Sequence, residues 1–133
     1  MKEQIFQIGV KSLIKNKDGK FLITKGRSYN YWDIPGGRMD KDESIQDTLK
    51  RELKEELGIK VKMLGLHIAV ISKIKIKAGK DLVGLMLLIY DCKLPAGVRL
   101  VSRPEYDEFK WVDKKEIIKR LGNKFPKEFF ESL

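Results

Sequence analysis

The sequence contains very little cysteine or histidine. Cys92 and His67 are the single examples among 133 residues, so the chain can form no internal disulfide and no thiol-rich zinc site. Nothing around Cys92 suggests a reactive thiol, and we expect it to be a small core residue. We expect His67 to be a packed or exposed residue rather than a catalytic base.

Long apolar stretches are also missing. The longest runs from Leu82 to Tyr90, and its nine residues are too few to span a bilayer as a helix. The first residues, Met1 to Gln4, lead into an alternating segment rather than an apolar leader. We therefore expect a cytoplasmic protein without a membrane anchor.

The composition is that of a folded protein with a basic surface. The chain is 42% hydrophobic and 35% charged, and its length is that of one domain with a substantial core. Lysine and arginine number 28 against 19 acidic residues, which gives a net charge of +9. Such a charge favours an anionic partner, namely nucleic acid, free nucleotides or a membrane surface. Scattered lysines on a solvated surface would give the same composition.

The first half of the chain predicts strands followed by a helix. Apolar residues in Ile5–Lys15 and Phe21–Thr24 flank an Asp-Gly turn, which indicates a β-hairpin. Ile34–Gly37 reads as a turn, because it combines proline and two glycines. Ser44 starts a capping pattern with an acidic residue three positions later, and the helix after it is expected to end at Leu57, before a glycine.

The second half predicts a further hairpin, a strand and a helical tail. Val61–Lys77 should be a strand, with apolar and basic faces alternating near its end, and Leu82–Leu94 its partner, buried on both faces. Phe109–Val112 should be a short strand and Lys114–Leu121 a helix capped by an aspartate. Phe125, Phe129 and Phe130 in the tail should pack on the body. These elements indicate an α/β protein with a mixed sheet covered by helices.

Three glutamates lie along one edge of the predicted central helix. At about 100° per residue, Glu52, Glu55 and Glu56 border the leucine face. Like charges three and four residues apart repel one another. Arg51 can reach Glu55, but it is expected to lie away from the Glu52–Glu56 edge. A hard divalent cation with oxygen ligands would neutralise the cluster. The other interpretation is a solvated helix face with ordinary ion pairs.

The sequence around these glutamates resembles a known motif. The segment from Gly37 to Ile59 reads GRMDKDESIQDTLKRELKEELGI. Its glycine, its glutamates and its Arg-Glu pair have the spacing of the Nudix box of the Nudix hydrolases, and Trp32–Gly37 resembles the segment that usually precedes the box. The resemblance implies a single domain, residues 1–133, with the Nudix α/β/α sandwich, a mixed β-sheet and flanking helices.

The resemblance also implies a reaction and roles for individual residues. Nudix hydrolases attack a pyrophosphate phosphorus of a nucleoside diphosphate-linked substrate with water, using Mg²⁺ or Mn²⁺. By position, Glu52, Glu55 and Glu56 would bind the metal, together with the Gly36 carbonyl. Glu52 or a carboxylate outside the box would activate water.

Further roles concern the residues around the box. The resemblance implies that Arg51 and Glu43 orient the glutamates. The resemblance also implies an additional carboxylate, which Nudix enzymes often recruit from the loop before the late strand. Glu105 and Glu108 both precede that strand, and the loop position of Glu105 makes it our first choice.

The absence of certain residues narrows the candidate substrate classes. Between Ile59 and Tyr90 the chain lacks the proline typical of ADP-ribose hydrolases and the tyrosine typical of dinucleoside polyphosphate hydrolases. A nucleoside triphosphate, including an oxidised one, is then the first hypothesis, with a dinucleoside polyphosphate or nucleotide sugar also considered. Residues near the box that could bind such a substrate are Lys25, Arg27, Arg38 and Tyr31.

Two other functions use the basic surface. An RNA 5′-end pyrophosphohydrolase would keep the chemistry and bind RNA along Lys73, Lys75 and Lys77. A non-catalytic nucleotide- or RNA-binding module would need no intact box. The complete box argues against that module. The oligomeric state is not indicated by any feature of the sequence.

Overall fold

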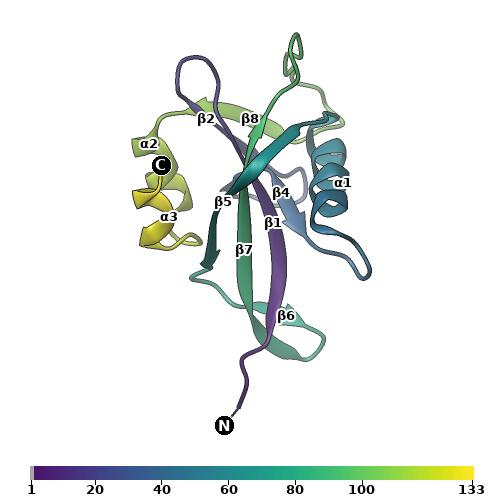
Figure 1. The fold of residues 1–133 in the computed structure, drawn as a ribbon, viewed down its shortest axis with the longest axis vertical. Helices are drawn as coiled ribbons and strands as arrows, with labels where there is room; N and C mark the ends of the chain where they lie inside the picture. The colour runs from purple at the N-terminus through teal and green to yellow at the C-terminus, as the bar shows by residue number, and fades with distance from the viewer. Residues whose placement is uncertain (1) are drawn as a thin grey trace.

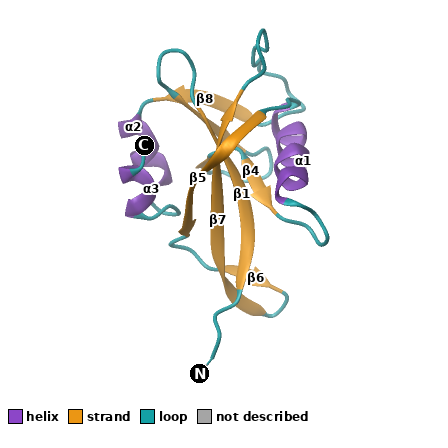
Figure 2. Cartoon of the chain, in the orientation of Figure 1, coloured by secondary structure: helices purple, strands orange, loops and turns teal. Residues whose placement is uncertain are grey.

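The computed structural model describes residues 2–133, which form two β-sheets and three helices (Figures 1 and 2). The strands are β1 (Phe6–Ile14), β2 (Phe21–Lys25), β3 (Trp32–Asp33), β4 (Gly36–Arg38), β5 (Lys62–Ile71), β6 (Ile76–Ala78), β7 (Asp81–Lys93) and β8 (Glu108–Val112). The helices are α1 (Ile45–Leu57), α2 (Lys114–Leu121) and α3 (Lys127–Glu131).

The larger sheet is mixed, as predicted. It has the order β4-β1-β7-β5, and β6 pairs with the first residues of β7. β1 and β7 are parallel, whereas β4, β5 and β6 run antiparallel to their partners. The smaller sheet, β3-β2-β8, is antiparallel. Helix α1 lies on one side of the strands and α2 with α3 on the other, which confirms the α/β/α sandwich (Figure 1).

Strand β1 contributes to two hydrophobic cores because successive side chains of a strand point to opposite faces. Val10 and Ile14 are fully buried against the leucines of α1, and Leu13 packs on the other side with residues of α2 and the tail. In β7, Leu87 and Ile89 are fully buried. The side chains that alternate with them are half-buried, so the second face of β7 is less enclosed than predicted.

The predicted hairpin between Ile5–Lys15 and Phe21–Thr24 is wrong. A tight turn does connect the two strands, but a single bridge from Lys15 to Phe21 is their only ladder contact among the described residues. β1 then pairs with β4 and β7, and β2 with β3 and β8. The turn signal is local, whereas the pairing is decided by partners far away in the sequence.

Two other local predictions need correction. Ile34–Gly37 is not only a turn, because Gly36 and Gly37 belong to the edge strand β4. The Val61–Lys77 strand is interrupted after Ile71, and only Ile76–Ala78 returns to the sheet as β6. The hairpin of β6 with β7 is present, with Gly79 in the left-handed conformation at its turn.

Helices α1 and α2 begin and end where the sequence predicts. The Ser44 hydroxyl accepts a hydrogen bond from the backbone N–H of Asp47, and Gly58 adopts a left-handed φ of 67° after the last turn of α1. Asp113 caps α2 by accepting from the N–H of Glu116. α1 packs through its leucines, and Glu56 is the one buried acidic residue of its described turns.

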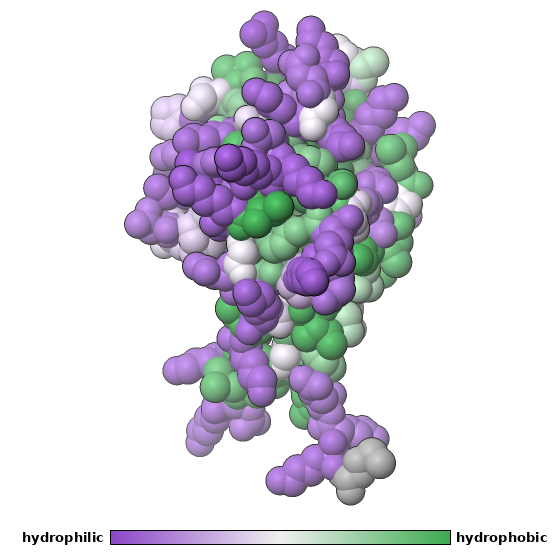
Figure 3. All heavy atoms as spheres, turned by 90° about the vertical axis from the view of Figure 1, so that its left-hand side faces the viewer, coloured by the Kyte–Doolittle hydropathy of each residue, from purple (hydrophilic) through white to green (hydrophobic). Residues whose placement is uncertain are grey.

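The C-terminal aromatic residues close the second core. Phe125 and Phe129 are fully buried, with ring centroids 4.7 Å apart, and Phe130 packs edge-on against Phe129. His67 on β5 helps to hold this segment, because its ring nitrogens lie 3.1 Å from Asp91 and 2.9 Å from the Ser132 hydroxyl. The outer face around α2 and α3 is largely hydrophilic (Figure 3).

No helix in residues 2–133 combines the length and apolar character needed to cross a membrane.

Phe129→Ala should lower the free energy of unfolding by about 3–5 kcal/mol, because it removes a fully buried ring and leaves a cavity. Urea denaturation followed by circular dichroism measures this loss. Ile118→Ala is the control, since Ile118 on α2 is 43% exposed and should change stability little. Equal losses in the two variants would contradict this account of the packing.

Candidate active site on helix α1

The three glutamates of α1 have different environments. Glu55 is 61% exposed, Glu52 is 19% exposed, and Glu56 is buried at 8% exposure. This gradient follows from the helical spacing, which turns Glu56 toward the sheet and Glu55 toward solvent. The helix therefore presents one carboxylate inside the protein, one at the boundary and one outside.

Glu56 is anchored to the edge strand β4. Its carboxylate accepts a hydrogen bond from the Gly36 N–H at 3.0 Å and another from the Thr24 hydroxyl at 3.4 Å. Burial raises the pKa of Glu56 to about 8, although the charge of Lys11 and the Gly36 hydrogen bond act in the opposite direction. Ionisation of this side chain is thus costly unless positive charge lies close to it.

Arg51 holds the outer carboxylates. Its guanidinium forms a bidentate pair with Glu43, at 2.7 and 3.0 Å, and donates to Glu52 at 2.8 Å and to Glu55 at 3.5 Å. Hydrogen bonds from Arg51 lower the pKa of Glu43 to about 2. The expectation that Arg51 lies away from the Glu52–Glu56 edge is wrong. The long side chain curls back along the helix, so part of the predicted repulsion is offset internally.

Two glycines allow β4 to pack closely, Gly36 against β1 and Gly37 against the Glu52 side chain of α1. A Cβ on Gly36, whose φ is 137°, would lie 2.1 Å from the Val10 carbonyl oxygen. A Cβ on Gly37 would lie within 2.3–2.5 Å of the Glu52 carboxylate. Any side chain at either position would displace the strand or the glutamate. The Gly36 carbonyl accepts a hydrogen bond from Lys11 at 3.3 Å.

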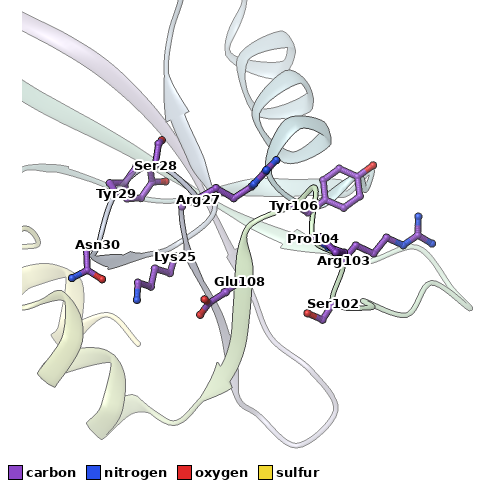
Figure 4. A pocket seen from close by; sticks show the side chains of 11 residues that line it. Lys25, Arg27, Ser28, Tyr29, Asn30, Ser102, Arg103, Pro104, Tyr106 and Glu108 are labelled. Atoms are coloured by element: carbon purple, nitrogen blue, oxygen red, sulfur yellow. The ribbon is translucent and has the colours of Figure 1, made fainter.

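A large cavity lies beside the C-terminal end of α1. It has a volume of about 940 Å³ and is formed by the β2–β3 loop and the segment before β8 (Figure 4). Lys25, Arg27 and Arg103 line it together with Tyr29, Tyr106 and the single acidic residue Glu108. The Arg27 side chain extends toward the helix, and Arg27 also donates to the Glu105 carbonyl at 2.9 Å. The cavity is therefore predominantly cationic.

Comparison with known proteins identifies the family. The family model described as "NUDIX domain" matches residues 5–133, nearly the whole chain. The chain belongs to the Nudix family. Its fold also matches the crystal structure of a MutT protein from Methanosarcina mazei Go1, with a TM-score of 0.67, 25% identity, and coverage of 99% of this chain and 93% of the other.

Curated relatives carry names of hydrolases. The chain is 30% identical over 115 residues to nucleoside triphosphatase NudI of Escherichia fergusonii, covering 79% of this chain and 80% of the relative. It is 28% identical over 121 residues to an RNA pyrophosphohydrolase of Halorhodospira halophila, covering 81% and 67% of the two chains. The protein is accordingly a Nudix pyrophosphohydrolase, and Nudix hydrolases generally use divalent metal cations.

The donor set of this Nudix helix suits such a cation, although the carboxylates do not converge. Within residues 2–133, no three acidic, histidine or cysteine side chains are grouped closely enough to hold a metal ion. Glu52 is engaged by Arg51, and Glu56 by the Gly36 N–H. The available ligands are nevertheless all oxygens on one helix edge, where the Glu52 carboxylate lies directly over Gly37, and hard divalent cations prefer oxygen ligands.

The predicted substrate-binding residues are divided by the structure. Lys25 and Arg27 line the cavity. Arg38 is exposed at the end of β4, where its carbonyl accepts from Arg51. Tyr31 is 53% exposed and stacks on Tyr29, with ring centroids 4.4 Å apart. Only the first two of the predicted four therefore belong to the cavity lining.

Among the carboxylates before β8, the sequence analysis missed Asp107. Glu105 and Glu108 are exposed, and Glu108 lines the cavity. The backbone N–H of Asp107 donates to the Glu56 carbonyl at 2.8 Å, and its negative charge contributes to the raised pKa of Glu56. Burial raises the pKa of Asp107 itself. No local signal distinguishes Asp107 from its neighbours, because its position results from docking of this loop on α1.

Arg51→Ala should lower the hydrolysis rate by roughly 10- to 100-fold, the usual effect of losing a residue that orients a ligand. It should also lower the melting temperature, because Glu43 and Glu52 lose their partner. Arg51→Lys should recover only part of the hydrolysis rate and of the melting temperature, because an ammonium cannot form the bidentate pair. Turnover and thermal unfolding are measured, with Lys54→Ala on the exposed side of α1 as control. Wild-type values for Arg51→Lys would contradict the orienting role.

Proposed function

We propose that the protein hydrolyses a pyrophosphate bond of a nucleoside triphosphate, oxidised triphosphates included, in a Mg²⁺-dependent reaction. The observation that carries this proposal is the cationic cavity beside the glutamate helix. Its volume of about 940 Å³ is sufficient for a nucleotide, and its positive charge suits a polyphosphate. The site would thus join a binding region for anions to a cluster of oxygen ligands.

In this proposal Glu52, Glu55 and Glu56 hold the cation together with the Gly36 carbonyl. When bound, the cation neutralises charge on the phosphate oxygens and orients the substrate. Arg51 and Glu43 keep the outer glutamates in place through the bidentate pair. Mn²⁺ has similar ligand preferences and should substitute for Mg²⁺.

A carboxylate accepts the proton of the attacking water. Water oxygen forms a bond to phosphorus, the bridging P–O bond breaks, and the leaving phosphate takes the electron pair. Glu105 is the choice from the sequence and Glu52 the choice within the box. The structure favours Asp107 over Glu105, because its charge acts on Glu56 and its backbone is fixed to α1.

Side chains in and beside the cavity support the proposed substrate class. Lys25, Arg27 and Arg103 would pair with phosphate oxygens, and the paired rings of Tyr29 and Tyr31 offer a stacking surface for a base. Arg38 would approach the phosphates from the β4 side. The similarity to a nucleoside triphosphatase supports the same substrate class.

The RNA 5′-end alternative receives less support. The predicted strand with a regular basic face over Lys73, Lys75 and Lys77 is interrupted, and the Lys73 ammonium donates to the Gly122 carbonyl. Because one relative is named an RNA pyrophosphohydrolase, the experiment below also tests this alternative.

A substrate screen tests the proposal directly. Nucleoside triphosphates, oxidised triphosphates, dinucleoside polyphosphates, nucleotide sugars and 5′-triphosphorylated RNA are incubated with the protein and Mg²⁺ or Mn²⁺, and the products are identified. We expect a nucleoside monophosphate and pyrophosphate from a triphosphate, and no turnover in excess EDTA. Preference for RNA, with steep salt dependence, would favour the alternative. Turnover that survives chelation would exclude the metal role.

Glu55→Gln and Glu56→Gln should each reduce hydrolysis by orders of magnitude while the protein stays folded. Each substitution keeps the size of the side chain but removes the charge of a proposed metal ligand. Steady-state kinetics at saturating Mg²⁺ and circular dichroism measure the two effects. Asp47→Asn in the first turn of α1 is the matched control. If both glutamine variants are fully active, the helix edge is an ordinary solvated surface.

Asp107→Asn, Glu105→Gln and Glu108→Gln should identify the base. The variant that removes it should lose about a hundredfold or more in kcat, the typical contribution of a general base. We expect this loss for Asp107→Asn, measured over pH at saturating metal. Losses of about tenfold or less in all three variants would leave Glu52 as the base.

A further inference from the structure

Charged side chains from four parts of the chain meet inside the protein, next to the glutamate helix. Lys11 of β1, Asp33 of β3 and Glu56 of α1 are 6%, 4% and 8% exposed. Lys124, between α2 and α3, reaches the same place. Burying charges is unfavourable unless they are paired and hydrogen-bonded, so the role of each member can be traced through its contacts.

Lys11 uses all three of its N–H donors on one short segment. Its ammonium donates to the Asp33 carboxylate at 3.1 Å, to the Ile34 carbonyl at 3.4 Å and to the Gly36 carbonyl at 3.3 Å. All three acceptors belong to the segment that leads from β3 into β4. This lysine therefore fixes the backbone of that segment from one side.

The far end of the segment carries the contact to α1. The Gly36 N–H donates to Glu56, while the Gly36 carbonyl accepts from Lys11. One residue thus links the buried lysine to the buried glutamate. If the segment shifts, the hydrogen bond that holds Glu56 shifts with it.

Opposite charges in this cluster lie next to one another. Asp33 binds two ammonium groups, Lys11 and Lys124, which leaves one positive charge in excess. Burial opposes the charged form of Lys11, but the charges of Asp33 and Glu56 outweigh it, and the pKa of Lys11 is raised. The charge of Lys11 lies close to the Glu56 carboxyl and acts against the effect of burial on its pKa.

We propose that Lys11 is a positioning residue, which holds the 33–36 segment and, through the Gly36 N–H, sets the place of Glu56 in the metal-binding edge. This inference rests on the proposed function, in which Glu56 is a metal ligand. Lys11 itself touches neither substrate nor metal. Lys124 supports it by holding Asp33 from the other side.

Positioning and simple charge predict opposite effects on cation binding. A fixed ammonium near the site repels a divalent cation, so its removal by itself should strengthen binding. Loss of positioning should weaken binding, because a displaced ligand and a freed backbone no longer fit the cation. The sign of the change in affinity therefore separates the two roles.

The experiment compares Lys11→Met with the wild-type protein in the absence of substrate. Mn²⁺ affinity is measured by electron paramagnetic resonance, and hydrogen exchange of the Gly36 amide by NMR. We expect Mn²⁺ binding roughly 10- to 100-fold weaker and faster Gly36 exchange. On the substrate found in the screen, kcat should fall while KM stays unchanged. Leu121→Ala, a buried change in α2, is the control for lost stability.

Equal or tighter Mn²⁺ binding in Lys11→Met would overturn the proposal. The proposal would also be overturned if the Gly36 amide of Lys11→Met exchanges no faster than that of Leu121→Ala, with the two variants compared at equal global stability. If Lys11→Met does not fold, Lys11→Arg replaces it. Arginine keeps the charge, but its planar guanidinium cannot donate to the same three acceptors. If Lys11 acts by positioning, Lys11→Arg should bind Mn²⁺ more weakly; if it acts only by its charge, the Mn²⁺ affinity should not change.

Failure of the proposed function would look different. A wild-type protein that hydrolyses no pyrophosphate would refute that function, whereas Gly36 exchange in the two variants would still decide whether Lys11 holds the segment.

Discussion

The hydrogen bond between the Gly36 N–H and the buried carboxylate of Glu56 ties the helix of the site to the sheet. A carboxylate removed from water is unfavourable unless donors and positive charge surround it. Several features of the fold meet this requirement at once. Gly36 has no side chain to keep β4 away from β1, Thr24 supplies a hydroxyl, and Lys11 supplies charge. The geometry of the site depends on this one contact.

The helix divides its surface into parts with different tasks. Its leucines bury against β1 and β2, and this packing fixes the axis. Glu56 lies at the inner edge, Glu52 at the boundary and Glu55 outside. Arg51 then gathers the outer carboxylates through contacts that include Glu43, which precedes the helix. The proposed cation ligands therefore lie on a rigid element rather than on a loop, and rigid support favours accurate placement of ligands.

Much of the local structure could be predicted because its causes are local. Caps at Ser44 and Asp113 and the left-handed Gly58 are decided by side chains within a few residues of the helix ends. Strand pairing could not be predicted in this way. The Asp-Gly turn after β1 suggests a hairpin, yet the backbone of β1 is already used by β4 and β7. The basic segment before β6 alternates like a strand, but its Ser72 side chain bonds to the Lys124 carbonyl instead of continuing a ladder.

For the site, the sequence by itself determined the family, the chemistry of the proposed ligands and the helix that carries them. These follow from residue types at fixed spacing within one helix and its flanks. Only the tertiary structure decided which glutamate is buried, where Arg51 points, and that Lys11, Asp33, Asp107 and Lys124 gather around the helix. The physical reason is that burial and charge pairing depend on segments up to 91 residues apart, as for Lys124 and Asp33, and their spacing along the chain carries no trace of that contact.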